Sequence, residues 1–376
     1  MKKYGCSSVC EFLGNFVVYR NLIPYESRLP SLGDIRSQVG LPEGIIPRKS
    51  TVEYARVIIH MLKKARTLDA PGCSIENLVY IGDTRGNDGT AFINLCRAGD
   101  WRGLIFIGSE NESPLKVEID IQDNLVHFIA NQWEALKDFA SFCGKQGVPL
   151  DERTVAVIDI DKTALGARGR NGHVIDQARV EAAENTVNEL LHERFDSKSF
   201  QAAYNHLNQP EFHFFTTDNQ DYLAYICLLL GSGLFTLDSL LADLSSGLMT
   251  NFEQFIGKAD RSVNELPPDL QRIHRDIYTR VQAGNPTPFV EFRYNEYQAT
   301  VRRMGCLSDS ARVEELLEKE IVITQEVRQM ALAWKKQGVL LFGLSDKPDE
   351  ASIPTVDLAA KGYRPIHQVE THVIGG

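Results

Sequence analysis

Hydrophobic positions along the chain follow two alternating patterns, which predict strands interleaved with helices. Residues 50–68 carry apolar side chains at helical spacing, with a Ser-Thr start and a basic final turn. Short apolar runs follow at 77–83 and 103–108, with a helical pattern at 90–100 between them. Apolar strands that alternate with helices are typical of a parallel sheet buried on both faces. We therefore expect an α/β fold built on a Rossmann-like parallel sheet.

The remainder of the chain continues this pattern but contains a long interruption. A helical pattern around 127–147 leads to an apolar strand at 154–161, and two further strands are predicted at 338–346 and 370–376. Between these strands, residues 164–330 are mostly helical in pattern. The sequence therefore predicts a helical domain inserted after the strand at 154–161.

These patterns divide the chain into four parts. Residues 1–43 are rich in Pro and Gly turn signals and are interpreted as an irregular N-terminal extension. The first part of the sheet domain is expected at 44–163, the helical insertion at 164–330 and the second part of the sheet domain at 331–376. A helical pattern at 311–338 crosses the last of these boundaries.

Composition and charge narrow the class of protein. The 376 residues are 43% hydrophobic and 24% charged, as in ordinary globular proteins. The longest strongly apolar stretch, 222–235, is short and interrupted by glycine, so it predicts a buried helix rather than a membrane span. A formal net charge of −10 argues against general binding to nucleic acid or anionic membranes, which requires a basic surface. A local basic pocket for an anionic substrate is compatible with this charge.

The cysteines and the N-terminus bear on the cellular setting. The seven cysteines are scattered, and their odd number and lack of C-x-x-C spacing fit neither a disulfide framework nor a zinc site. Cys6 and Cys10, at helical spacing, are interpreted as neighbours on one helix face rather than as ligands. Glu11 and Asn15 interrupt the segment where a signal peptide needs an unbroken apolar region. We expect a cytoplasmic protein, and the sequence carries no signature of a particular oligomeric state.

Three predicted strands end in polar residues. Asp159 and Asp161 end one strand, Asp83 ends a second and Ser345 ends a third, while Lys49 stands at the start of the helix that precedes the Asp83 strand. Ligands of open parallel sheets bind at the carboxyl ends of the strands. These five residues are therefore the first candidates for a functional site.

The same residues resemble the motifs of the haloacid dehalogenase-like (HAD) hydrolases. The segment DIDKT, residues 159–163, is similar to the first motif, and LLFGLS, which ends in Ser345, is similar to the second. Lys49 resembles the lysine of the third motif. YIGDTRGND, with Asp83 and Asp88, resembles the fourth.

The order of these motifs departs from that of the family by a cyclic shift. The chain carries them in the order third, fourth, first, second. Joining the terminal strand at 370–376 to the helix that carries Lys49 would restore the usual order. The resemblance therefore implies a circularly permuted HAD core, with its chain ends between the third strand and that helix. Such a rearrangement disturbs the fold little, because the ends of a compact domain often lie close together at its surface.

The resemblance also implies chemical roles. Asp159 would attack phosphorus and form an aspartyl-phosphate, and Asp161 would act as general acid and base. Mg²⁺ would be bound by Asp159, the main-chain carbonyl of Asp161 and Asp83, with Asp88 holding a metal-bound water.

Two remaining motif residues would hold the phosphoryl oxygens. These are Ser345 and Lys49, with Lys347 as the rival of Lys49 because it follows Ser345 closely. The segment DKTAL also resembles the phosphorylation sequence of P-type ATPases, which would make Asp161 the nucleophile. In both families a threonine lies four residues after the nucleophile. Thr163 occupies that position relative to Asp159, so we assign the attack to Asp159.

The helical insertion lies where HAD proteins carry a type 1 cap, a lid that selects the substrate. The resemblance implies that residues 164–174 form the hinge and flap of this cap. Thr163, Arg168, Arg170 and Lys347 are the candidate substrate-binding residues. The arginines and His173 are positioned to reach an anionic substrate or to form a solvated basic turn. The aromatic segments 211–225 and 291–298 would line a pocket or form the core of the insertion.

The function expected from these residues is Mg²⁺-dependent phosphatase activity on a small phosphorylated metabolite. Asp161 disfavours a dehalogenase, which needs no acid to protonate its leaving group. A phosphotransferase of the same superfamily and a catalytically silent ligand-binding or regulatory protein are the alternatives.

Overall fold

The computed structural model describes residues 1–122 and 125–376, which form two compact units. The sheet unit comprises Met1–Gln177 and Thr300–Gly376, and the helical unit comprises Ala178–Ala299. The fold is α/β with a mostly parallel sheet, as the apolar strand pattern predicts. The insertion expected at 164–330 is longer than the helical unit, because 164–177 and 300–330 belong to the sheet unit.

The main sheet has seven strands in the order β2-β9-β7-β3-β4-β6-β5. Neighbours run parallel, except that β5 at the edge is antiparallel to β6. The strand bounds are β2 Val17–Val18, β3 Asn77–Gly82, β4 Arg102–Gly108, β5 Val117–Gln122, β6 Leu125–Ala130, β7 Thr154–Asp159 and β9 Leu340–Leu344. β7 lies between β9 and β3, so the carboxyl ends of these three strands meet at one edge.

The strand order becomes regular when the strands of the main sheet are renumbered from β7. The numbering runs from β7 to the C-terminus and then continues from the N-terminus. The six parallel strands then read 3-2-1-4-5-6, the order of the doubly wound Rossmann sheet. In that order the topological switch point lies between the strands numbered 1 and 4, which are β7 and β3 here. Ligands of such sheets bind outside the carboxyl ends of the strands at this point.

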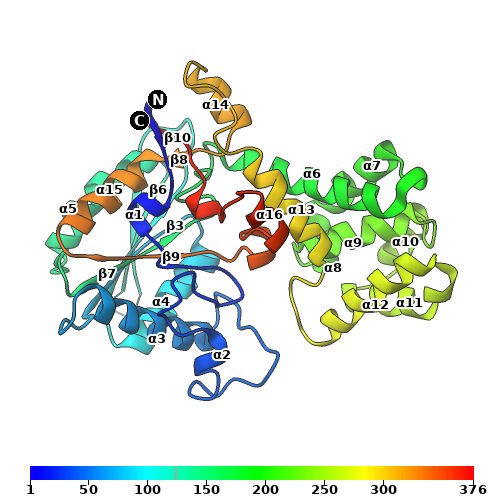
Figure 1. Ribbon diagram of the computed structural model, residues 1–376, viewed down its shortest axis with the longest axis horizontal. Coiled ribbons are helices and arrows are strands. Elements are labelled where there is room, and N and C mark those ends of the chain that lie inside the picture. The colour runs from blue at the N-terminus through cyan, green and yellow to red at the C-terminus, as the bar shows by residue number, and fades with distance from the viewer. Residues whose placement is uncertain (123–124) are drawn as a thin grey trace. The chain divides into compact units, whose positions relative to one another are not determined.

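Helices cover both faces of the main sheet (Figure 1). Ile105 and Ile107 of β4 belong to a buried cluster that also contains residues of α3 and α4. Phe106, between them, points to the other face and packs on Phe139 of α5. Alternate side chains of one strand thus enter two cores, which explains why the strand is apolar at nearly every position.

The helices of the sheet unit are α1 Cys10–Leu13, α2 Leu32–Ile35, α3 Val52–Asp69, α4 Thr90–Gly99, α5 Leu136–Lys145, α14 Val313–Lys319, α15 Gln325–Lys336 and α16 Val356–Ala360. Short 3-10 turns occur at Trp133–Ala135, Asp349–Ala351 and Ile366–Gln368 in this unit, and at His192–Arg194, Pro210–Phe212 and Val263–Glu265 in the helical unit.

A second sheet joins the two ends of the chain. Its strands are β1 Lys2–Ser7, β10 Thr371–Gly375 and β8 Ile323–Thr324, in the order β1-β10-β8. β1 runs antiparallel to β10 and pairs Lys2 with Gly375, so the N and C labels lie side by side in Figure 1. The expectation that 370–376 extends the main sheet is therefore wrong.

The edge position beside β9 is taken by β2, from the segment expected to be irregular. Val18 pairs with Leu344, and both side chains are fully buried. A two-residue strand among turn signals is too short to produce a periodic pattern, which explains why the sequence did not reveal it. Cys6 lies in β1 and Cys10 begins α1, so the expected shared helix face is also wrong.

Two segments that were predicted to be entirely helical each contain a strand. The segment 127–147 begins within β6, and its helix α5 starts at Leu136. The segment 311–338 is broken by β8 at Ile323–Thr324, where the run Ile-Val-Ile-Thr is β-branched throughout. In both cases an apolar run fits helix and strand equally well, and pairing with a neighbouring strand decides between them.

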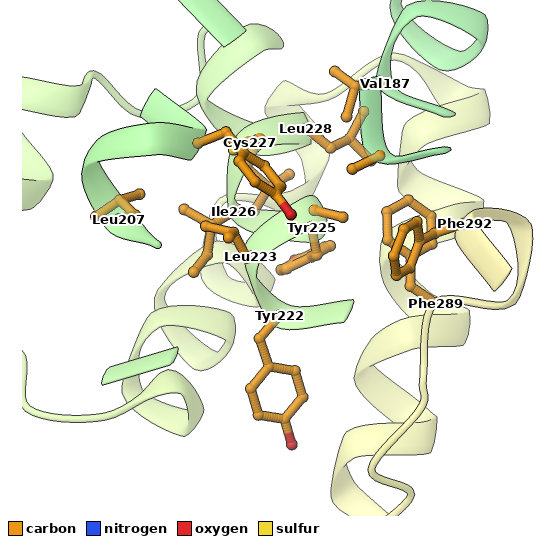
Figure 2. Packing of buried hydrophobic residues seen from close by; sticks show 14 of the residues in the cluster. Val187, Leu207, Tyr222, Leu223, Tyr225, Ile226, Cys227, Leu228, Phe289 and Phe292 are labelled. Carbon is orange, nitrogen blue, oxygen red and sulfur yellow. The ribbon is translucent and has the colours of Figure 1, made fainter. Parts of the chain in front are cut away.

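The helical unit has its own buried core. Its helices are α7 Ser197–Leu207, α8 His213–Thr216, α9 Gln220–Gly231, α10 Leu237–Ser245, α11 Phe252–Arg261 and α12 Pro268–Gln282, and α6 Gly172–Leu191 and α13 Val290–Val301 continue into it from the sheet unit. The expected buried helix at 222–235 is α9, which is buried from Tyr222 to Leu229. Figure 2 shows α9 side chains with Leu207, Phe289 and Phe292 of the same cluster. Among the described residues, no helix has the length and apolar character needed to cross a membrane.

Aromatic residues of the two segments considered as pocket walls enter this core. Tyr222 stacks on Phe252 with ring centroids 3.7 Å apart, and Phe215 and Phe292 are fully buried. Tyr297 is buried as well. These rings are engaged in packing, as apolar helical spacing ordinarily indicates.

Candidate functional site

Three carboxylates converge at the carboxyl ends of β7 and β3. Asp159 is the last residue of β7, Asp83 directly follows β3, and Asp88 lies in the π-helical turn Arg85–Gly89 after it. One carboxylate oxygen of each lies within 4.8 Å of the others. The expected set of metal-ligating carboxylates is thus brought together at the switch point between β7 and β3.

A buried lysine bridges two of these carboxylates. The Nζ atom of Lys49 donates to Asp159 Oδ1 at 2.6 Å and to Asp88 Oδ1 at 2.7 Å. Thr51 caps the N-terminus of α3, and Lys49 lies just before this cap with a side chain only 1% exposed. A buried ammonium group requires such anionic partners, because removing it from water alone is costly.

The loop after β3 wraps around the Asp88 carboxylate. Its Oδ2 atom accepts hydrogen bonds from the main-chain nitrogens of Asp83 and Thr84 and from the Thr84 hydroxyl, at 2.9 to 3.1 Å. Gly82 makes this approach possible, since a Cβ atom there would lie 2.7 Å from the Asp88 side chain. Asp88 therefore anchors the loop that presents Asp83, in addition to facing the cluster.

The three carboxylates differ in their proton affinity. Burial would raise the pKa of Asp88, but Lys49 and the loop hydrogen bonds lower it to about 2. Burial and the neighbouring Asp88 carboxylate raise the pKa of Asp83 to about 7, although Arg168 opposes this shift. Burial also raises the pKa of Asp159 well above its usual range, with Lys49 opposing and the other two carboxylates adding to the effect.

Burial is the largest cause of both raised pKa values, and the excess of negative over positive charge in the cluster adds to it. Three carboxylates face one ammonium and one guanidinium, so the fully ionised group carries a net charge of −1. A divalent cation would reverse this imbalance and stabilise the ionised carboxylates. The donors are all carboxylate oxygens, the ligand type preferred by Mg²⁺.

Arg168 supplies the guanidinium. Its Nε atom lies 2.5 Å from Asp83 Oδ2, and its side chain is 43% exposed. Its main-chain oxygen accepts from Trp133 Nε1 and from the Glu110 nitrogen, which fixes the loop near the end of β4. Gly169, with φ +77°, permits this contact, because a Cβ atom would lie 2.0 Å from the Glu110 oxygen. The arginine expected to bind substrate thus stands at the edge of the carboxylate cluster.

Arg170 forms buried ion pairs with two glutamates. Its guanidinium is buried and bonds Glu110 Oε2 and both oxygens of Glu326, each at 2.9 Å. These partners use the donor groups that substrate binding would require. The structure therefore does not bring Arg170 to the candidate site.

Ser345 follows β9 at the same sheet edge as Asp159. The register pairs Asp159 with Leu344, the residue before Ser345. The Ser345 hydroxyl accepts from the Lys347 nitrogen at 3.1 Å, and the Lys347 ammonium donates to Thr300 Oγ1 at 3.1 Å. The structure thus pairs Lys49 with the candidate nucleophile and Lys347 with a threonine hydroxyl.

The turn after β7 carries Asp161 and Thr163. Asp161 is half-buried and forms a backbone bridge with Leu165, and its carboxylate is not among the three that converge. Lys162 adopts a left-handed conformation, with φ 62°, which turns the chain sharply after the strand. The Thr163 side chain is buried, and its Oγ1 atom has no hydrogen-bond partner among residues 1–122 and 125–376.

Two residues of this site were missed in the sequence. Tyr80 donates from its hydroxyl to Asp88 Oδ1 at 3.3 Å and lies beneath Lys49, whose Nζ is 5.7 Å from the ring centre. Thr84 holds the other Asp88 oxygen. Nothing in the apolar strand pattern distinguishes Tyr80 from its neighbours. Thr84 directly follows Gly82-Asp83, and this position could have identified it as a turn residue.

Comparison of the chain with protein-family models, with curated proteins and with solved structures gave no match. We therefore infer the function from the residues of the site and from the strand order that positions them.

Proposed function

We propose that this protein is a Mg²⁺-dependent phosphohydrolase that acts on a small phosphorylated metabolite through an aspartyl-phosphate on Asp159. The observation that carries the proposal is the convergence of Asp159, Asp83 and Asp88 within 4.8 Å, with Lys49 bonded to two of them. The bound cation would neutralise charge on the phosphoryl oxygens and orient the phosphoryl group.

The proposed reaction has two steps. Asp159 attacks phosphorus while the bond to the leaving oxygen breaks, and Asp161 gives its proton to that oxygen. Asp161 then takes a proton from water, which attacks phosphorus and breaks the bond to Asp159, releasing inorganic phosphate. Lys49 fixes the direction of the attacking carboxylate and offsets its charge, and Ser345 is assigned to a phosphoryl oxygen.

The strand order supports a circularly permuted HAD core. The motif-bearing strands β9, β7 and β3 are adjacent and parallel, and the count that starts at β7 gives a doubly wound order. The permutation proposed from the motif order starts at the same strand. Because β2 supplies the edge strand beside β9, we now assign the break in the chain to the connection between β9 and β2.

The helical unit supports the cap assignment by its place in the chain. It is inserted between β7 and β9, and the chain enters and leaves it within α6 and α13. We propose that this unit is the type 1 cap and that it selects the substrate. The loop expected to be the hinge, 164–174, is hydrogen-bonded within the sheet unit, so we place the hinge nearer to residues 177 and 300.

Hydrolysis of p-nitrophenyl phosphate with and without Mg²⁺ tests the proposal. We expect Mg²⁺-dependent turnover in the wild type and a loss to background in Asp159→Asn, of the order of 10⁴- to 10⁶-fold. Asp138→Asn, at an exposed position of α5, is the matched control and should retain wild-type turnover. A hydroxylamine-sensitive phosphoryl-enzyme, absent in Asp159→Asn, would identify the intermediate. Equal turnover by wild type and Asp159→Asn would refute the covalent mechanism.

The same experiment separates the alternative functions. A phosphotransferase would form the intermediate and, when an alcohol acceptor is added, would release p-nitrophenol faster and yield the phosphorylated alcohol in place of inorganic phosphate. A ligand-binding protein without catalysis would form no intermediate with any member of a panel of phosphorylated metabolites.

A further inference from the structure

A second group of metal-ligating side chains lies in the three-stranded sheet. Cys6 of β1 and His372 of β10 are paired directly across the two strands, and Asp309 comes from the loop before α14. Their ligand atoms lie within 4.8 Å of one another. The donors are one thiol, one imidazole and one carboxylate, unlike the all-carboxylate cluster at β7.

The two distances from Asp309 to the other ligand atoms match those of a tetrahedral metal site. Cys6 Sγ lies 3.6 Å from Asp309 Oδ1, and His372 Nε2 lies 3.2 Å from the same oxygen. Zinc bound at about 2.3 Å to sulfur and about 2.0 Å to nitrogen and oxygen in tetrahedral geometry places these pairs about 3.5 Å and about 3.3 Å apart. These two pairs are thus already spaced for a common ion, and the third pair, Cys6 with His372, lies within 4.8 Å.

His372 presents an unsatisfied nitrogen to this group. Its side chain is 2% exposed, and Nε2 has no hydrogen-bond partner in the part of the chain that the structure describes, although it lies within ion-pair distance of Asp309. Its other nitrogen, Nδ1, lies 2.7 Å from Glu320 Oε1. With the Glu320 carboxylate as acceptor, Nδ1 carries the hydrogen, so Nε2 is the nitrogen of the ring that is left to bind a metal.

Glu320 is fixed in place beside the histidine. It is fully buried and accepts hydrogen bonds from Thr371 Oγ1 and from the main-chain nitrogens of Leu307 and His372. A buried carboxylate that orients a ligating histidine through its second nitrogen is the recurring outer support of zinc sites.

We propose that Cys6, Asp309 and His372 bind one zinc ion, with Glu320 orienting the histidine. The thiolate and the Asp309 carboxylate balance the charge of the ion, and the mixed sulfur, nitrogen and oxygen donors select zinc over magnesium. The Asp309 side chain is 92% exposed, so an ion reaches the site without unfolding, and water can fill the fourth position. The ion would tie β1, β10 and the Asp309 loop together. This proposal does not depend on the proposed phosphohydrolase activity.

Metal binding by the full chain, with any affinity tag removed, tests the site directly. After treatment with a chelator and addition of Zn²⁺, elemental analysis should find bound zinc that is lost in Cys6→Ser and Asp309→Asn. With Co²⁺ as probe, the wild type should show tetrahedral visible bands and a thiolate-to-cobalt charge-transfer band. Glu320→Gln should weaken metal affinity by about 10- to 100-fold while the charge-transfer band remains at saturation.

Matched controls separate this site from the carboxylate cluster and from misfolding. Cys73→Ser removes another partly exposed thiol, and Asp83→Asn removes a carboxylate of the β7 cluster; both should retain the cobalt spectrum. Cys6 and Asp309 are exposed, so their variants should keep the wild-type circular dichroism spectrum. Zinc should raise the melting temperature of the wild type but not that of Cys6→Ser.

Two results would overturn the proposal. One is a cobalt spectrum without a charge-transfer band, which would mean that the Cys6 thiolate does not bind the metal. The other is zinc binding that survives Cys6→Ser and disappears in Asp83→Asn, which would assign the ion to the carboxylate cluster.

Discussion

The Lys49 ammonium lies 2.6 Å from the Asp159 carboxylate, although 110 positions separate the two residues. Lys49 precedes α3, the helix that leads into β3, and Asp159 ends β7, which pairs with β3. The contact therefore depends on the parallel pairing of two strands that are not consecutive in the chain. It places a positive charge where the proposed mechanism needs one and stabilises the fold at the same point.

Replacing Lys49 by methionine should destabilise the protein and suppress activity. The change keeps most of the side-chain volume but leaves Asp88 and Asp159 buried without their cation, at a cost of about 3 to 5 kcal/mol in the free energy of unfolding. Urea denaturation measures this loss. Added Mg²⁺ should restore part of the stability, because it supplies positive charge to the same carboxylates. Lys63→Met, at an exposed position of α3, should change neither stability nor activity.

Arg168→Gln should tighten Mg²⁺ binding. Arg168 holds Asp83 Oδ2 and competes with a cation for that carboxylate, and its side chain is partly exposed. We expect an increase in Mg²⁺ affinity of up to about tenfold, measured by titration calorimetry. If Arg168 also contacts the substrate phosphate, KM rises while kcat changes little. Arg85→Gln, which removes an arginine from an exposed pair with Glu118, is the control. Unchanged Mg²⁺ affinity in Arg168→Gln would contradict the competition.

Arg170→Met should lower stability without affecting KM. Its guanidinium is bonded to Glu110 and Glu326, and its side chain is only 3% exposed. Loss of the cation should cost about 3 kcal/mol in the free energy of unfolding, since two partly buried carboxylates lose their partner. A double-mutant cycle with Glu326→Gln should show coupling between the two positions. A large rise in KM at unchanged stability would return Arg170 to substrate binding.

Stability should fall as the pH is lowered, in part because of His367. This residue is fully buried, its Nδ1 lies 2.8 Å from the Tyr19 hydroxyl, and burial lowers its pKa from 6.5 to about 4. Above pH 6.5 the ring is neutral in both folded and unfolded chains, so its contribution is fully present. As the pH falls from about 6.5 to about 4 the unfolded chain is protonated first, which costs the folded state about 3 kcal/mol.

Urea denaturation across this pH range measures the His367 contribution. His367→Asn can keep a hydrogen bond to Tyr19 but has no proton to gain, so its stability should depend less steeply on pH. His60→Asn, at an exposed position of α3, should follow the wild-type curve. Parallel curves for wild type and His367→Asn would assign the acid sensitivity to other groups.

Much of the sheet and part of the site were predictable from sequence. The strands at 77–83, 103–108, 154–161 and 338–346 are apolar throughout because both faces are buried, and this pattern is local. Polar residues at their ends marked Asp83 and Asp159. The sequence did not predict the edge strands β2 and β5, nor β6, which lies within a helical pattern. These segments are strands because they pair with neighbouring strands and not because of their periodicity.

The sequence by itself determined the apolar strands and the residue types at their ends, because side-chain burial on both faces of a strand imposes a local pattern. Tertiary structure decided which of those residues meet. It paired Lys49 with Asp159, assigned Arg168 to Asp83 and Arg170 to two glutamates, and brought Cys6 opposite His372. The last case shows the reason most clearly. Ligand spacing along the chain indicated no zinc site, since the residues of the proposed site come from three distant segments. Strand pairing sets Cys6 opposite His372, and the loop before α14 brings Asp309 to them.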